Sequence, residues 1–159
     1  AVRSIKARVS PLAMQITGGA DGKPATSLAA KFDLRYCIAL GLEGRNVSAT
    51  DFIEPWRPDP AVVARTADIA AAADPRIGVA AAEIDAELAD GTTESFRIAA
   101  SKGHPGNPMD WDDMWQKFEA LVTPTLGSKT RELFETVRMF GKGGTRESLS
   151  RALRTLPAN

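Results

Sequence analysis

The sequence has few of the residue types that most often carry out chemistry, and it has no net charge. Its 159 residues include one cysteine, one histidine and one tyrosine, and aromatic residues make up 6%. A lone cysteine cannot form a disulfide within the chain, and a lone histidine argues against a metal site or a proton relay built on paired imidazoles. We therefore expect no bound metal. Twenty basic residues balance twenty acidic ones, so we also expect no nucleic-acid partner.

Long apolar runs are missing as well. No run approaches the roughly 18 to 20 residues that a membrane-spanning helix needs, and the N-terminus lacks the layout of a signal peptide. We therefore expect a cytoplasmic protein with no membrane partner. The chain starts with Ala1 rather than Met, and a strand pattern begins at Val2, so we also expect it to begin inside a longer protein.

Alternating residues predict a strand at the start of the chain. Over residues 4–9, Ile5, Ala7 and Val9 share one face, as in a half-buried strand. Residues 17–24 hold three glycines and a proline, which predicts a flexible and exposed loop.

Helix-capping residues precede the next elements. Asp33 predicts a helix over residues 34–43, with an inner face of Leu34, Ile38 and Leu42. Ser48 and Asp51 have the spacing of a capping box, which predicts a short helical turn. Asp59 followed by proline predicts a helix over residues 60–73, and its expected buried residues are Val62, Ile69 and Ala73.

A hairpin is the clearest local pattern. Residues 82–88 and 95–100 alternate on either side of Asp90-Gly91, which is typical of a two-stranded antiparallel unit. Acidic residues on the first strand are expected to pair with Arg97 on the second.

The pattern of the C-terminal third predicts helices. After a loop over residues 102–108, Asp110 begins an amphipathic helix, and further helices are predicted over residues 128–140 and 146–155. The first helix carries an apolar stripe of Trp111, Met114, Trp115, Phe118, Leu121 and Val122. These patterns predict an α+β fold: a two-layer α/β sandwich with a small, mostly antiparallel sheet over residues 1–108, and additional C-terminal helices over residues 109–159.

No nucleotide, nucleophile-elbow or metal motif is present, but five blocks resemble one family in order and spacing. The blocks are SIKARVSPLAMQITG (4–18), AKFDLRYCIALGLEG (30–44), DPAV (59–62), LADGT (88–92) and KGHPGNPMDWDDMWQKF (102–118). They resemble the C-terminal region of the MmgE/PrpD family.

The resemblance implies a longer, two-domain enzyme in which a smaller α/β domain closes over an active site on a helical domain. Members act on small polycarboxylates without a cofactor, as 2-methylcitrate dehydratase, cis-aconitate decarboxylase or iminodisuccinate epimerase. The expected function is thus the C-terminal domain of a 2-methylcitrate dehydratase-like hydro-lyase, with an upstream helical domain as its partner and a homo-oligomeric assembly. Residues 109–159 are then expected to pack on that helical domain.

Two departures from the family pattern concern activity. The family's smaller domain usually opens with a segment of Lys, Tyr-Pro and His, and this chain starts after that segment. The helix that ends before Glu43-Gly44 is also one residue short. Most of the expected acid and base residues are then absent, so the 159-residue chain is expected to be inactive alone.

The resemblance gives Tyr36 and Lys31 as catalytic candidates. Tyr36 lies in the first turn of a predicted helix, where a phenol can donate to a carboxylate or act as an acid. The alternative is that its ring only packs in the interdomain interface. Lys31 can supply charge to a carboxylate, although a lysine beside a helix start is more often solvated.

Lys102, Gly103 and His104 are the candidates for substrate binding, as a loop at the cleft entrance. His104 is the one side chain that titrates near neutral pH, yet family members often carry Asp there, which favours a surface or capping role. Cys37 is adjacent to Tyr36, but a lone cysteine in an apolar helix is more often a small core residue than a nucleophile.

An alternative hypothesis is a non-catalytic α+β domain that binds another protein, or dimerises, through the helices after residue 110. The net charge of zero and the aromatic stripe agree with both hypotheses. Only the enzyme hypothesis requires a helical domain upstream.

Overall fold

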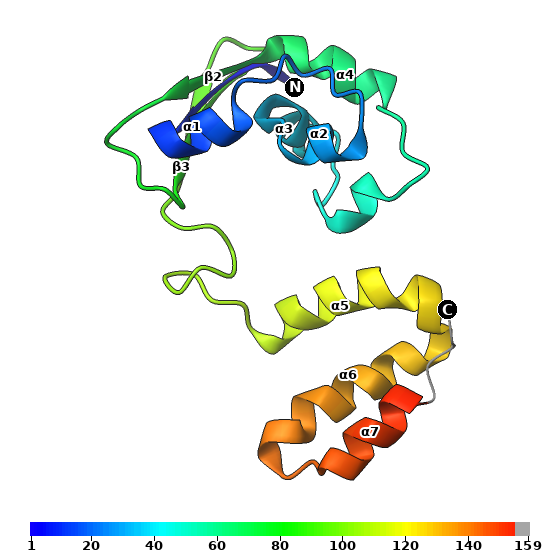
Figure 1. The fold of residues 1–159 in the computed structure, drawn as a ribbon. Coiled ribbons are helices and arrows are strands. Elements are labelled where there is room, and N and C mark those ends of the chain that lie inside the picture. Colours follow the sequence, from blue (N-terminus) through cyan, green and yellow to red (C-terminus); the bar gives the residue numbers. More distant parts are fainter. Residues whose placement is uncertain (155–159) are drawn as a thin grey trace. The chain divides into compact units, whose positions relative to one another are not determined.

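The computed structural model describes residues 1–154, which divide into a unit of residues 1–108 and a second unit that begins at Met109. The elements of the first unit follow in chain order (Figure 1): β1 (Val2–Val9), α1 (Pro11–Thr17), α2 (Ser27–Lys31), α3 (Leu34–Leu42), a 3₁₀ turn (Ala49–Phe52), α4 (Pro60–Arg65), a second 3₁₀ turn (Thr66–Asp68), β2 (Ile69–Ala73), β3 (Ala82–Leu88) and β4 (Thr93–Ile98).

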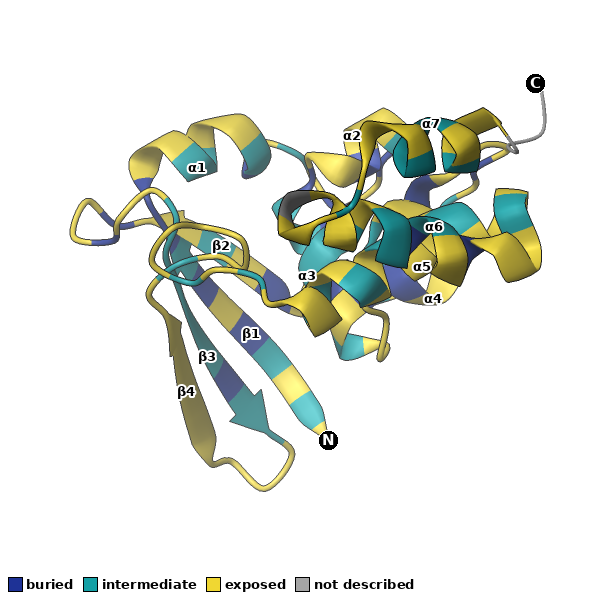
Figure 2. Cartoon of the chain, turned by 90° about the horizontal axis from the view of Figure 1, so that it is seen from below, coloured by how far each residue is buried: buried dark blue, intermediate teal, exposed yellow. Residues whose placement is uncertain are grey.

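The four strands form one mixed sheet in the order β2-β1-β3-β4. β1 runs parallel to β2 and antiparallel to β3, and β3 runs antiparallel to β4. Along β1, the predicted inner residues Ile5, Ala7 and Val9 are buried, whereas every residue of β4 is exposed (Figure 2). The sheet and its helices confirm the predicted α+β class.

The core lies between the sheet and helices α3 and α4. Its buried members are Ile5, Ala30, Tyr36, Ala39, Leu40, Phe52, Trp56, Val62, Ile69 and Ala86. The inner face of α3 therefore differs from the predicted one: Tyr36, Ala39 and Leu40 are buried, and the predicted residues are only partly buried. Tyr36 fits the core because its ring is apolar and its hydroxyl finds a partner there.

The predicted helix over residues 60–73 is wrong in its second half. α4 ends at Arg65, and Ile69–Ala73 is β2, which pairs with β1 from Ile5↔Ile69 to Val9↔Ala73. Alanine favours helix locally, but ladder pairing with β1 and burial of Ile69 decide the conformation. Ala73 is exposed rather than buried.

The loop over residues 17–24 is less exposed than predicted, because Gly18, Gly22 and Pro24 are buried. The Arg35 guanidinium donates to the carbonyl of Ala20 at 2.8 Å. Pro11 is the first residue of α1 and follows the cap residue Ser10.

The predicted caps are confirmed. Asp33 and Asp59 cap α3 and α4, and Ser48 with Asp51 forms the predicted capping box. The hairpin is also confirmed, although β4 spans Thr93–Ile98 and so begins and ends two residues earlier than expected.

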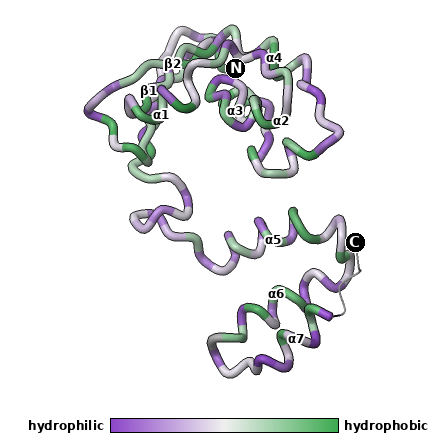
Figure 3. The backbone as a smooth tube through the Cα atoms, in the orientation of Figure 1, coloured by the Kyte–Doolittle hydropathy of each residue, from purple (hydrophilic) through white to green (hydrophobic). Residues whose placement is uncertain are grey.

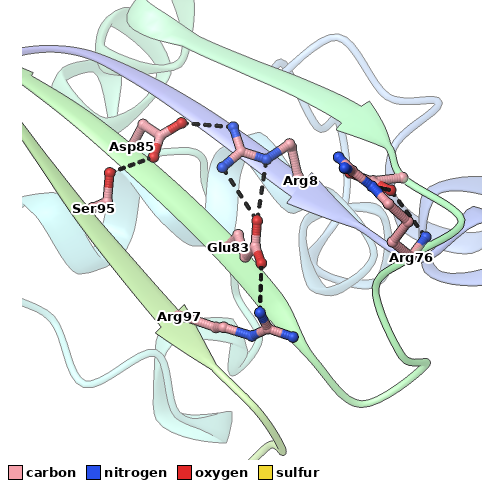
Figure 4. A network of polar contacts seen from close by, with 7 residues as sticks. Arg8, Arg76, Glu83, Asp85, Ser95 and Arg97 are labelled. Carbon is pink, nitrogen blue, oxygen red and sulfur yellow. Dashed lines mark hydrogen bonds and ion pairs between the residues drawn. The ribbon is translucent and has the colours of Figure 1, made fainter.

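The face of the sheet opposite the core carries a network of charged side chains (Figure 4). Glu83 on β3 pairs with Arg97 on β4 at 3.4 Å, as predicted. Arg8 on β1 adds pairs to Asp85 at 2.6 Å and to Glu83 at 3.3 Å. Ser95 donates to the other oxygen of Asp85 at 2.7 Å.

The second unit is helical: α5 (Trp111–Leu126), a 3₁₀ turn (Gly127–Lys129), α6 (Thr130–Met139), a 3₁₀ turn (Phe140–Lys142) and α7 (Arg146–Arg154). Hydrophobic and hydrophilic residues alternate along these helices (Figure 3). Asp110 caps α5 as predicted. Residue 155, the predicted end of the last helix, and Leu156 lie outside the described residues.

The aromatic stripe of α5 packs within this unit. The Phe134 ring of α6 is buried, and its centroid lies 5.0 Å from that of Trp115, 5.4 Å from Phe118 and 6.1 Å from Trp111. The Arg131 guanidinium lies over the Trp115 ring at 4.4 Å. Packing against α6 therefore accounts for part of the stripe's apolar surface.

Candidate active site

The start of α3 is fixed by a buried carboxylate. Asp33 is 1% exposed. One of its oxygens accepts the backbone N–H of Tyr36 and the other accepts that of Gly22, both at 3.0 Å. Asp33 thus caps the helix and ties it to the preceding loop, which sets the position of Tyr36.

Tyr36 is 2% exposed. Its ring meets the Trp56 ring edge to face, with centroids 5.9 Å apart and an interplanar angle of 71°. Its hydroxyl oxygen accepts the backbone N–H of Asp59 at 3.3 Å. Among the described residues no acceptor takes its O–H, so this phenol keeps one unused donor.

The Tyr36 side chain forms part of the wall of a surface hollow of about 360 Å³. The surface of the hollow is mostly polar and includes four charged side chains. Besides Tyr36, its lining residues are Leu40, Arg45, Asp51, Ile53, Pro55, Trp56, Arg57 and Asp59. Small-molecule sites are usually lined mostly by apolar groups with a few polar ones, so the polar surface of this hollow favours a small charged ligand.

The two acidic residues of the hollow are held by one arginine. Arg45 lies 3.5 Å from Asp51 and 3.1 Å from Asp59, measured between nitrogen and oxygen. Asp51 also accepts the Ser48 N–H at 2.8 Å, and Asp59 accepts the Ala61 N–H at 2.9 Å. These carboxylates therefore serve the local structure.

Lys31 lies near the hollow without lining it. Its side chain is exposed, and Nζ is 6.0 Å from the centroid of the Phe52 ring. The neighbouring Glu54 accepts the Ser27 hydroxyl at 2.6 Å and the Trp56 N–H at 2.8 Å. These hydrogen bonds lower the pKa of Glu54, and the charges of Arg57 and Lys31 add to the effect.

The environment of Cys37 makes it a poor nucleophile. Burial, with the nearby charges of Asp33 and Asp51, raises the pKa of its thiol to about 11. The sulfur lies 3.5 Å from the carbonyl oxygen of Ala30. A thiol that stays protonated at neutral pH is a weak nucleophile, which agrees with a core role.

The second group of candidates forms a turn of its own. The Gly103 N–H donates to the Asn107 carbonyl at 2.8 Å, and His104 Nδ1 accepts the Gly106 N–H at 3.0 Å. Lys102, Gly103 and His104 are all exposed. None of the three belongs to the lining of the Tyr36 hollow in the part of the chain that the structure describes.

Sequence reasoning missed Arg45 and Arg57 as neighbours of Tyr36. Both follow helix or turn ends in irregular segments, where no periodic pattern marks them. Asp59 was recognised only as a helix cap, and its contact with Tyr36 spans 23 positions. A basic residue next to Trp56 in a proline-rich segment is the one local signal available.

Residues 1–154 contain neither a cluster of metal ligands nor a membrane-spanning helix. No group of three or more His, Cys, Asp or Glu side chains is placed to hold a metal ion. No helix in that range is long and apolar enough to cross a membrane.

A small α+β domain with a polar hollow beside a helix-borne tyrosine is thus the class that the structure defines. Residues 1–140 match the sequence model of the MmgE/PrpD C-terminal domain. The chain therefore belongs to the MmgE/PrpD family, as its C-terminal domain. A search of curated proteins gave no match.

Proposed function

We propose that this chain is the smaller domain of a cofactor-independent lyase that acts on a small polycarboxylate, and that the reaction is a dehydration like that of 2-methylcitrate dehydratase. Family membership over residues 1–140 supports the enzyme class. The observation that carries the role of this chain is Tyr36, which lines a hollow and whose hydroxyl accepts the Asp59 N–H while its own O–H has no acceptor among the described residues.

Dehydration next to a carboxylate breaks a C–H bond and a C–OH bond and forms a C=C bond, while the proton and the hydroxyl leave as water. A base takes the proton from carbon, and a donor assists the departing hydroxyl. In this proposal Tyr36 is that donor, or it holds a substrate carboxylate through its O–H. The base belongs to an upstream helical domain.

The proposal extends to Lys31 and to the turn of Lys102, Gly103 and His104. Lys31 raises the positive potential near the hollow without touching it. The exposed turn is a candidate rim that contacts substrate when the domains meet. We further propose a homo-oligomer in the cytoplasm, with the 159-residue chain inactive by itself.

Tyr36→Phe in the full-length gene product tests this role. Loss of the donor is expected to lower kcat by about a hundredfold or more, and loss of the hydrogen bond from Asp59 N–H costs about 1 kcal/mol of folding stability. Steady-state kinetics on 2-methylcitrate measure the first effect, and a thermal melt followed by circular dichroism measures the second. Unchanged kcat and KM in a folded variant remove Tyr36 from the site.

A further inference from the structure

Arg57 differs from Arg45 in what its guanidinium contacts. Both line the hollow. Arg45 is neutralised by Asp51 and Asp59, whereas Arg57 makes no ion pair within residues 1–154. Its Nη1 donates to the Trp56 carbonyl oxygen at 2.9 Å, which anchors one edge of the guanidinium and leaves its remaining N–H groups for other acceptors.

The acidic groups around Arg57 are already occupied. Asp51 and Asp59 are held by Arg45 and by backbone N–H groups. Glu54 accepts the Ser27 hydroxyl and the Trp56 N–H, and the charge of Arg57 adds to the lowering of the Glu54 pKa. The residues that line the hollow thus hold two unused donors, the Arg57 guanidinium and the Tyr36 hydroxyl, beside the exposed apolar side chains of Ile53 and Pro55.

We propose that Arg57 binds a carboxylate group of the substrate in this hollow, with the Tyr36 O–H as the second donor. A planar guanidinium matches a carboxylate with two parallel N–H bonds, and such charge-assisted pairs are about twice as strong as neutral hydrogen bonds. Ile53 and Pro55 accommodate part of the carbon skeleton. This assignment rests on the proposed function for the identity of the ligand, and it makes Arg57 a determinant of substrate specificity.

The binding test uses the 159-residue chain and tricarballylate, a tricarboxylate with no hydroxyl to eliminate. Calorimetry gives Kd at constant ionic strength, and NMR follows the indole N–H of Trp56, which donates to the Asp51 carbonyl in the wall of the hollow. We expect the Trp56 signal to shift and those of Trp111 and Trp115 in the second unit to stay in place. No binding, or a shift confined to the second unit, overturns the proposal.

Variants then assign the binding to Arg57. Arg57→Gln is expected to raise Kd about tenfold or more, and Arg57→Lys to give an intermediate value because the charge remains and the paired donors are lost. The matched control is Arg97→Gln, an exposed arginine on the opposite side of the sheet from the core, which is expected to bind as the parent does. Equal Kd values for Arg57→Gln and the parent overturn the assignment.

Kinetics of the full-length product separate this inference from the proposed function. Turnover with an unchanged KM in Arg57→Gln removes Arg57 from the site and leaves the lyase proposal standing. Arg57-dependent binding by a protein without turnover supports the carboxylate site and contradicts the lyase proposal.

Discussion

Gly22 and Asp33 together determine where Tyr36 lies. Asp33 accepts the Gly22 N–H and caps α3, and Gly22 has a φ of +80°, a conformation that side chains with a Cβ rarely adopt. A Cβ at residue 22 would lie 2.4 Å from Oγ1 of Thr66. The loop before α3 thus requires glycine on two independent grounds.

Gly22→Ala is therefore expected to lower the free energy of unfolding by about 1–3 kcal/mol, the usual cost of overpacking. Urea denaturation of the 159-residue chain measures it. The control is Gly19→Ala in the same loop, where no atom lies within 4 Å of the added methyl group. Equal stabilities of the two variants would contradict the packing described for this loop.

At the scale of elements, helix caps can be predicted from the sequence more readily than strand pairing can. The caps Asp33, Ser48 and Asp110 were predicted because cap and helix are neighbours in the chain. The strand Ile69–Ala73 was missed because its partner, β1, lies more than sixty positions away. A similar separation in sequence kept the Arg8 contacts with β3 from being predicted. The Arg97 contact was predictable because Arg97 and Glu83 lie in the same hairpin.

The turn after β2 supplies a pH-dependent contribution to stability. Arg76 binds Asp74 with its side chain and its backbone N–H, and these bonds lower the pKa of Asp74 from 3.8 to about 2. A carboxyl group whose pKa is lowered by folding stabilises the protein above its unfolded pKa. This stabilisation is lost as the pH falls from about 3.8 through about 2.

Arg76→Gln is accordingly expected to lower the thermal midpoint at pH 6, with the difference from the parent shrinking as the pH falls below about 3.8. Thermal melts from pH 6 to pH 2 follow this trend. The Asp85 pKa is also lowered, first by Arg8 and then by Ser95, so both proteins lose stability over this range. A difference that stays constant with pH would contradict a charge-based role for Arg76.

On the scale of the whole molecule, the fold class and the family could be predicted from the sequence, whereas the site became visible only in the structure. Five blocks in order identified the family, and residues 1–140 match its C-terminal domain. The hollow could not be predicted, because Tyr36, Arg45 and the segment with Arg57 and Asp59 lie apart in the sequence. Only packing of α3 against the segment before α4 brings them together.

The central claim is that this chain serves an enzyme as its smaller domain. The most direct measurement is turnover of 2-methylcitrate, citrate and cis-aconitate by the full-length gene product, with the 159-residue chain assayed beside it. The account predicts activity in the full-length protein alone. No turnover by either protein, with no helical domain encoded upstream, would contradict the account and favour a non-catalytic interaction domain.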